Sequence, residues 1–189
     1  MARWLQVALI VATLLGSWLG MQAVHELGHV GGAILTGATV ERVVLHPLTL
    51  SRTEIGRNPQ PLLVVWAGPL VGVLLPLMTW RLLVFVRYRR AYLVRFFAGF
   101  CLVANGLYLG VGSLDGIGDA GDLLRLGCPP WLLWGFGLIT APLGLALWHG
   151  EGRHFGLGPH AQQVTAADVL PAVSGALGFL LLGLLVGGL

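Results

Sequence analysis

Two histidines and a glutamate form the part of the sequence best suited to chemistry. Residues 25–29 read His-Glu-Leu-Gly-His, so His25 and His29 lie four positions apart. On an α-helix such positions share one face, and the two imidazoles can bind one metal ion together. Zinc held by two histidines and one further ligand keeps a position open for water and lowers the pKa of that water to about 7. Glu26 lies beside the pair and can take a proton from the water, which is the chemistry of a zinc hydrolase.

A third zinc ligand has to come from a small set of carboxylates, because the chain contains only eight acidic residues. Residues 113–127 read SLDGIGDAGDLLRLG and carry Asp115, Asp119 and Asp122. Counting membrane crossings along the chain places this segment on the same side as the histidines. If the segment is one helix, the three aspartates share a face. The residues alone leave Asp119 and Asp115 open as the third ligand.

The elements that position these residues must lie in a membrane. Of the 189 residues, 56% are apolar and 10% are charged, against roughly 25% charged in soluble domains. This composition excludes a disordered chain and a nucleic-acid-binding domain. Two cysteines, Cys101 and Cys128, cannot hold a chain of this length together as a disulfide scaffold.

Five apolar segments are long enough to span a bilayer, which requires about 20 residues. They cover residues 4–35, 61–86, 96–114, 131–148 and 169–189. Between the first two, β-branched residues at 39–44 predict a short hairpin or pair of edge strands. We therefore predict an all-α integral membrane protein, residues 1–189 forming a single transmembrane domain. It has about five transmembrane helices and a short β-hairpin-like segment between helices one and two.

Three further residues could contribute to a site. Gly68 and Pro69 interrupt the second apolar segment, where proline removes one helical hydrogen bond. The opened backbone could pair with an extended substrate, although an ordinary proline kink is equally compatible with the sequence. Asn105 is a polar residue inside the third segment, where it could orient a ligand, stabilise an oxyanion or bind a neighbouring helix.

These motifs together resemble the site-2 protease family of intramembrane zinc metalloproteases. The similarity consists of HELGH near the end of a first transmembrane helix, Ala-Gly-Pro-Leu at 67–70 in the second, and a later aspartate motif. It extends over roughly residues 15–148 and is closest to the compact branch without PDZ or CBS domains. The last apolar segment and the loop at 149–168 lie outside it.

The resemblance implies a role for each motif residue. In the compact branch a Ser-Asp-Ala-type motif precedes Leu and Gly-x-Pro, and here Gly118-Asp119-Ala120 precedes Leu123 and Gly127-Cys128-Pro129. It thus implies Asp119 as the third Zn²⁺ ligand. Larger members use Leu-Asp-Gly, which Leu114-Asp115-Gly116 also matches, so Asp115 is the alternative.

The implied activity is hydrolysis of peptide bonds in or near transmembrane segments of membrane proteins, with Glu26 as the general base. Expected partners are a membrane-protein or peptide substrate and the lipid bilayer, with no nucleic acid, and the expected location is a bacterial plasma membrane. The alternative is a non-enzymatic membrane protein that retains a zinc site.

Arginines give an expected orientation, because the chain has eleven of them and no lysine. Seven lie on the side of the amino terminus and four on the side of the HELGH motif. The positive-inside rule therefore places the motif nearer the outer face. Better-known members of the family cut near the cytoplasmic face, so the rule and the resemblance conflict on this point.

Overall fold

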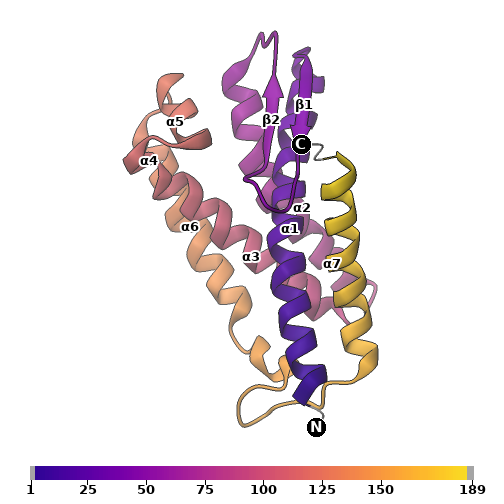
Figure 1. Ribbon diagram of the computed structural model, residues 1–189. Helices are drawn as coiled ribbons and strands as arrows, with labels where there is room; N and C mark the ends of the chain where they lie inside the picture. Colours follow the sequence, from indigo (N-terminus) through magenta and orange to yellow (C-terminus); the bar gives the residue numbers. More distant parts are fainter. Residues whose placement is uncertain (1–2, 187–189) are drawn as a thin grey trace.

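Five long helices form the protein, as the sequence predicts. The computed structural model describes residues 3–186, and within them five helices are long and apolar enough to cross a membrane (Figure 1). The chain is therefore a multi-pass membrane protein. The helices are α1 (Arg3–Thr36), α2 (Pro61–Phe85), α3 (Ala91–Gly110), α6 (Pro130–Trp148) and α7 (Ala166–Val186). The predicted end of the last span at residue 189 lies outside the described residues.

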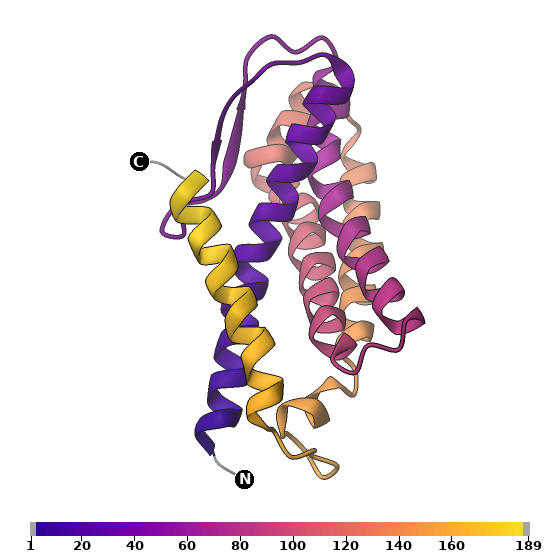
Figure 2. The same cartoon turned by 90° about the vertical axis from the view of Figure 1, so that its right-hand side faces the viewer.

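The predicted hairpin connects α1 to α2. Strands β1 (Val40–Val44) and β2 (Arg52–Ile55) pair antiparallel, with Val44 opposite Arg52. Figure 2 shows the hairpin folding back along α1 toward the end of α7. At its tip the Ser51 amide donates to Gln22 Oε1 of α1 at 3.1 Å. The hairpin thus packs against α1 and, through β1, against α7.

Glycines bring α1 and α2 into backbone contact next to the histidines. A Cβ added at Gly28 would lie 2.3 Å from the Ala67 carbonyl oxygen, and one added at Gly68 would lie 2.3 Å from His29 Nε2. Neither position accepts a side chain without a shift of the backbone or of His29. Small residues allow membrane helices to approach closely and gain van der Waals contact. The Gly28 contact therefore sets the distance between α2 and the histidine face of α1.

We expect Gly28→Ala to destabilise the bundle, whereas Gly31→Ala on the same helix should be neutral or slightly stabilising. The added methyl at residue 28 meets backbone atoms, and overpacking of this kind costs roughly 1–3 kcal/mol. At Gly31 a Cβ meets nothing within 4 Å, and alanine is the better helix former by about 1 kcal/mol. Thermal unfolding in detergent measures both variants. Equal melting temperatures would contradict the close contact.

The aspartate segment is not the single helix that the sequence suggests. It forms two short helices, α4 (Gly112–Asp115) and α5 (Gly118–Arg125), with a change of direction between them. Gly116 and Gly118 have φ angles of 63° and 53°, which glycine adopts without the cost borne by other residues. The three aspartates consequently do not share one helical face.

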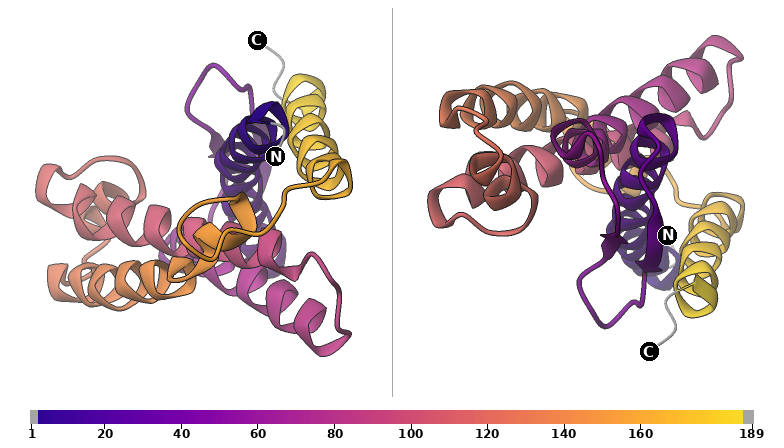
Figure 3. Two further views of the ribbon diagram at one scale, coloured as in Figure 1. Left: turned by 90° about the horizontal axis from the view of Figure 1, so that it is seen from below. Right: turned by 90° about the horizontal axis from the view of Figure 1, so that it is seen from above.

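The helices spread from α1 rather than forming a closed ring. Seen along the bundle in Figure 3, α3 and α6 lie side by side on one side of α1, while α7 lies against α1 away from α6. The short helix η1 (Glu151–Phe155) connects α6 to α7 at the end where α1 begins. His149, His154 and His160 belong to this connection, and therefore lie at the opposite end of the bundle from HELGH.

Candidate metal centre

The structure brings together both histidines and Asp119. His25 and His29 lie on one face of α1, and Asp119 lies in the first turn of α5. Asp119 Oδ2 is 2.8 Å from His25 Nε2 and 3.2 Å from His29 Nε2, and the two Nε2 atoms are 3.1 Å apart. Residues 25 and 29 are buried, with relative exposures of 7% each. Among the described residues, these three are the group of His, Cys, Asp or Glu side chains able to hold a metal ion.

The second nitrogen of each imidazole has a partner that accepts a hydrogen bond. His25 Nδ1 lies 2.7 Å from Asn105 Oδ1, and His29 Nδ1 lies 2.9 Å from the Val64 carbonyl oxygen. The Asn105 amide is oriented by Nδ2, which donates to the Cys101 carbonyl at 2.9 Å. Both Nδ1 atoms must therefore carry the proton and donate it. In the neutral imidazole this leaves each Nε2 with a free lone pair.

Three electron-pair donors consequently converge with no proton between them. Two Nε2 lone pairs and a carboxylate oxygen repel one another unless a cation lies among them. Tetrahedral zinc, with bonds of about 2.0–2.2 Å, keeps its ligand atoms roughly 3.3 Å apart. The three observed separations, 2.8, 3.1 and 3.2 Å, are close to this value. Two imidazoles and one carboxylate also form a donor set typical of catalytic zinc. The residues therefore fit zinc.

Asp119 is ionised in this arrangement. Burial alone would raise the pKa of its carboxyl, but a proton on the neighbouring His25 and His29, in the place a metal cation would take, outweighs that effect through hydrogen bonds and charge and holds the pKa well below its usual range. The backbone amide of Asp119 donates to the Tyr108 hydroxyl at 3.1 Å, which fixes the start of α5 beside α3. The carboxylate is thus both charged and held in position for a cation.

The other two aspartates of the segment lie elsewhere. Asp115 is exposed at the end of α4 and does not belong to the candidate metal group of the described residues. Asp122 is half exposed and forms an ion pair with Arg125. Of the two candidates for third ligand, the structure places Asp119 beside the histidines.

Glu26 is held by the hairpin. Its side chain is buried, and Oε2 accepts a hydrogen bond of 2.7 Å from the Thr53 hydroxyl of β2. A single accepted hydrogen bond leaves other lone pairs of the carboxylate available to a water or a substrate. β2 therefore positions the Glu26 carboxylate, the candidate base, and leaves part of its hydrogen-bonding capacity free.

A cavity of about 810 Å³ opens over these residues. Its lining includes His25, Glu26, His29 and Asp119, together with β2 and the beginning of α2. A second cavity of about 330 Å³ continues from it between α1 and α3 and is mainly apolar, with Trp18, Met21, Ala104 and Tyr108 in its lining. The site thus has a cavity at the histidines and a neighbouring, mainly apolar cavity between α1 and α3, and His25, Glu26 and Tyr108 line both.

Gly68, Pro69 and Asn105 are close to the histidines but outside the larger cavity. Gly68 packs directly against the His29 ring, and Pro69 is fully buried within α2, which continues as a helix past it. Asn105 is 1% exposed, and both polar atoms of its amide are engaged by His25 and Cys101. These contacts pack Gly68 against His29 and place Asn105 Oδ1 where it accepts from His25 Nδ1, and the substrate and oxyanion roles of these residues stay predictions.

We expect Asn105→Leu to lower zinc affinity by about 10- to 100-fold. The substitution removes the acceptor that fixes His25 in the tautomer with a free Nε2, and losses of this size are typical when the partner of a ligating histidine is removed. Competition with a zinc-binding dye measures the affinity. Gln163→Leu, a change at an exposed residue in the connection between α6 and α7, serves as the control and should not alter it.

Sequence reasoning missed two contributors to the site. Thr53 lies in a strand whose residue types predict only that it is a strand, and the Val64 carbonyl belongs to the backbone of an apolar helix. Neither carries a signal in the local sequence, because both act through tertiary contacts. An expectation that each ligating histidine needs an acceptor on its other nitrogen could have prompted a search for them.

Comparisons with protein-family models, curated proteins and solved structures found no match. What the centre can do is therefore inferred from its own donor atoms, base and cavity. These comprise three converging atoms that could hold a metal ion, a buried carboxylate beside them and a mainly apolar cavity between α1 and α3.

Proposed function

We propose that this protein is an intramembrane zinc metalloendopeptidase that hydrolyses peptide bonds in or near transmembrane segments. The observation that carries the proposal is the convergence of His25 Nε2, His29 Nε2 and Asp119 Oδ2 beside Glu26, in a cavity between membrane-spanning helices. Ionisable groups inside a membrane protein are costly and are usually retained for function. A carboxylate base next to a zinc-binding donor set is suited to hydrolysis.

Each residue has a distinct part in the proposed reaction. His25, His29 and Asp119 would hold a zinc ion, which when bound polarises a carbonyl and makes a water acidic. Glu26 takes the proton from the attacking water and later delivers it to the leaving amine, as a general base and then a general acid. Thr53 keeps the Glu26 carboxylate turned into the cavity. Asn105 and the Val64 carbonyl hold the two imidazoles with Nε2 facing the donor centre.

The hairpin supports an extended peptide as substrate. Strand β2 lines the cavity and, among the described strands, pairs only with β1, so its second edge is free. An extended chain can add to such an edge through backbone hydrogen bonds. Peptide carbonyls in a helix are engaged in internal hydrogen bonds, so a transmembrane substrate must unwind locally before hydrolysis. The free edge offers the unwound chain new hydrogen-bond partners.

Zinc content and peptide cleavage together test the proposal. The full-length protein, purified and reconstituted into liposomes, should contain about one zinc per chain by mass spectrometry of metals. It should cleave members of a set of single-span membrane peptides, at sites identified by mass spectrometry. Removal of zinc by a chelator should abolish cleavage, and added zinc should restore it. Absence of stoichiometric zinc would refute the proposal, whereas bound zinc with no cleavage of any peptide would favour the non-enzymatic alternative.

A further inference from the structure

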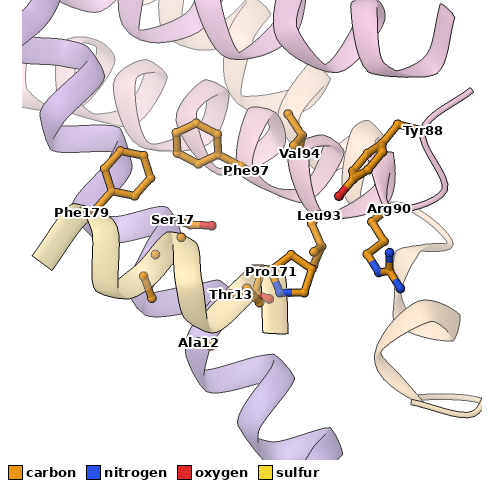
Figure 4. Close-up of a pocket in the computed structure, with 14 residues that line it drawn as sticks. Ala12, Thr13, Ser17, Tyr88, Arg90, Leu93, Val94, Phe97, Pro171 and Phe179 are labelled. Carbon is orange, nitrogen blue, oxygen red and sulfur yellow. The ribbon is translucent and has the colours of Figure 1, made fainter. Parts of the chain in front are cut away.

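A groove between α1, α3 and α7 lies at the end of the bundle away from the metal centre. It has a volume of about 200 Å³, and its floor consists of Ala12, Thr13, Gly16 and Ser17 of α1. Figure 4 shows its two ends, with Tyr88 and Arg90 at one and Phe97 and Phe179 at the other. Gly175 and Tyr88 at its rim are exposed, so the groove opens on the outer surface of the bundle, which lipid covers.

The groove exists because α7 packs on α1 while its other side stands away from α3. Phe97 of α3 and Phe179 of α7 approach each other at one end, with ring centroids 6.3 Å apart. Between Pro171 and Phe179 the groove follows α7 for about 12 Å, given a rise of 1.5 Å per residue. This is close to half of the roughly 30 Å hydrocarbon core, which is the depth of one leaflet.

The open end of the groove is cationic. Arg90 lines it, and Arg87 and Arg89 are exposed in the same connection between α2 and α3. Arg90 Nε lies 3.6 Å from Asp168 Oδ1, an ion pair too long for a hydrogen bond; this Nε is buried without a hydrogen-bond partner among the described residues, while the side chain as a whole is 25% exposed. A guanidinium has five N–H donors and matches phosphate geometry well. Arg90 therefore retains donors for an anion at the membrane surface.

Inside the groove one polar group lacks a partner. The Thr13 hydroxyl is buried, with 7% of the residue exposed, and has no hydrogen-bond partner within residues 3–186. A buried hydroxyl without a partner is destabilising by about 1–3 kcal/mol. An ester carbonyl of a glycerolipid is an acceptor that could satisfy it, whereas a plain hydrocarbon chain is not.

We propose that this groove binds one anionic glycerophospholipid from the leaflet on the arginine-rich side. One acyl chain lies along the small residues of α1, the ester region reaches Thr13, and the phosphate contacts Arg90 and the Tyr88 hydroxyl. A transmembrane helix of a partner is too large, because a helix about 10 Å wide needs several times the available volume over the same length. Basic pockets between membrane helices are suited to anionic headgroups.

Native mass spectrometry of the full-length protein tests the headgroup contact. The protein is released from nanodiscs containing equal amounts of phosphatidylglycerol and phosphatidylcholine with identical acyl chains. We expect one retained lipid per chain, with phosphatidylglycerol favoured at least about 5-fold. Arg90→Gln should remove this preference, whereas Arg89→Gln, on the same connection but outside the groove, should keep it. Equal retention of the two lipids by the unmodified protein, or equal effects of the two variants, would overturn the proposal.

A second pair of variants tests the acyl-chain contact. Gly175 lines the groove and Gly178 does not, yet a Cβ at either position meets nothing within 4 Å. Gly175→Leu should fill the groove and reduce retained lipid at least about 5-fold, while Gly178→Leu should leave retention unchanged. If Arg90→Gln does not fold, Tyr88→Phe replaces it and should lower the phosphatidylglycerol preference while leaving the ring in place. Unchanged retention in Gly175→Leu would contradict lipid binding in this groove.

Discussion

Asp119→Asn is expected to lower the affinity for zinc by about 100-fold or more. The substitution replaces a charged oxygen ligand that lies 2.8 Å from His25 Nε2 with a neutral amide. Structural zinc sites with four ligands bind with roughly 10–16 kcal/mol, so one ligand accounts for about 3 kcal/mol, which corresponds to a factor of about 100. Dialysis against zinc buffers, followed by measurement of bound metal, gives the affinity of each variant.

Asp115→Asn is the matched control for this prediction. Asp115 lies four residues earlier, carries the same side chain and matches the alternative Leu-Asp-Gly motif, but it is exposed at the end of α4. We expect its substitution to leave zinc affinity unchanged. A loss in Asp115→Asn with none in Asp119→Asn would mean that the segment rearranges when metal binds and that the other aspartate is the ligand.

The spans and the hairpin were predictable because their signals are local. Apolar runs of about 20 residues define a membrane helix by themselves, and the run of β-branched residues before Pro47 indicates a strand in the same way. The signal for the histidine pair is equally local, since positions four apart on one helix must share a face. No tertiary contact is needed to place His25 beside His29.

The third ligand could not be predicted from the local sequence pattern alone. Asp115 and Asp119 are equivalent by composition and by side of the membrane, and only the resemblance favoured Asp119. What separates them in the structure is the change of direction at Gly116 and Gly118, whose positive φ angles turn α5 back toward α1. A glycine in the sequence allows such a turn but does not require it. The Thr53 contact to Glu26 depends in the same way on how the hairpin folds back along α1.

The depth of the site explains why its polar groups are so completely paired. A buried polar group without a hydrogen-bond partner is destabilising, and lipid hydrocarbon cannot supply that partner. Each imidazole accordingly has a carbonyl acceptor, Glu26 has the Thr53 hydroxyl, and the Asn105 amide is itself anchored by Cys101. Two parts of the site have incomplete hydrogen bonding: the Glu26 carboxylate on its cavity side, and the three converging donor atoms of His25, His29 and Asp119. Within the site, incomplete pairing is thus limited to the atoms to which we assign chemistry.

Glu26→Gln is expected to abolish peptide cleavage while leaving zinc binding intact. The amide retains the size of the carboxylate and can still accept a hydrogen bond from Thr53, but it cannot take a proton from water. General acid–base groups contribute roughly 10²- to 10⁴-fold to rate, so kcat should fall at least about 100-fold with little change in KM. Bound zinc should remain near one per chain, because Glu26 is not among the three side chains that could hold the metal ion.

Glu54→Gln provides the matched control, since it changes the same functional group one residue beyond Thr53 on β2, where the side chain is exposed and paired with Arg52. We expect its cleavage rate to equal that of the unmodified protein. Full activity in Glu26→Gln would refute the assigned mechanism even if zinc is present. Loss of zinc together with activity would instead show that Glu26 supports the metal centre, and the base would have to be sought elsewhere in the cavity. If activity falls and zinc stays bound, proton transfer is separate from metal binding. The first function then belongs to Glu26 and the second to the neighbouring His25 with its partner ligands.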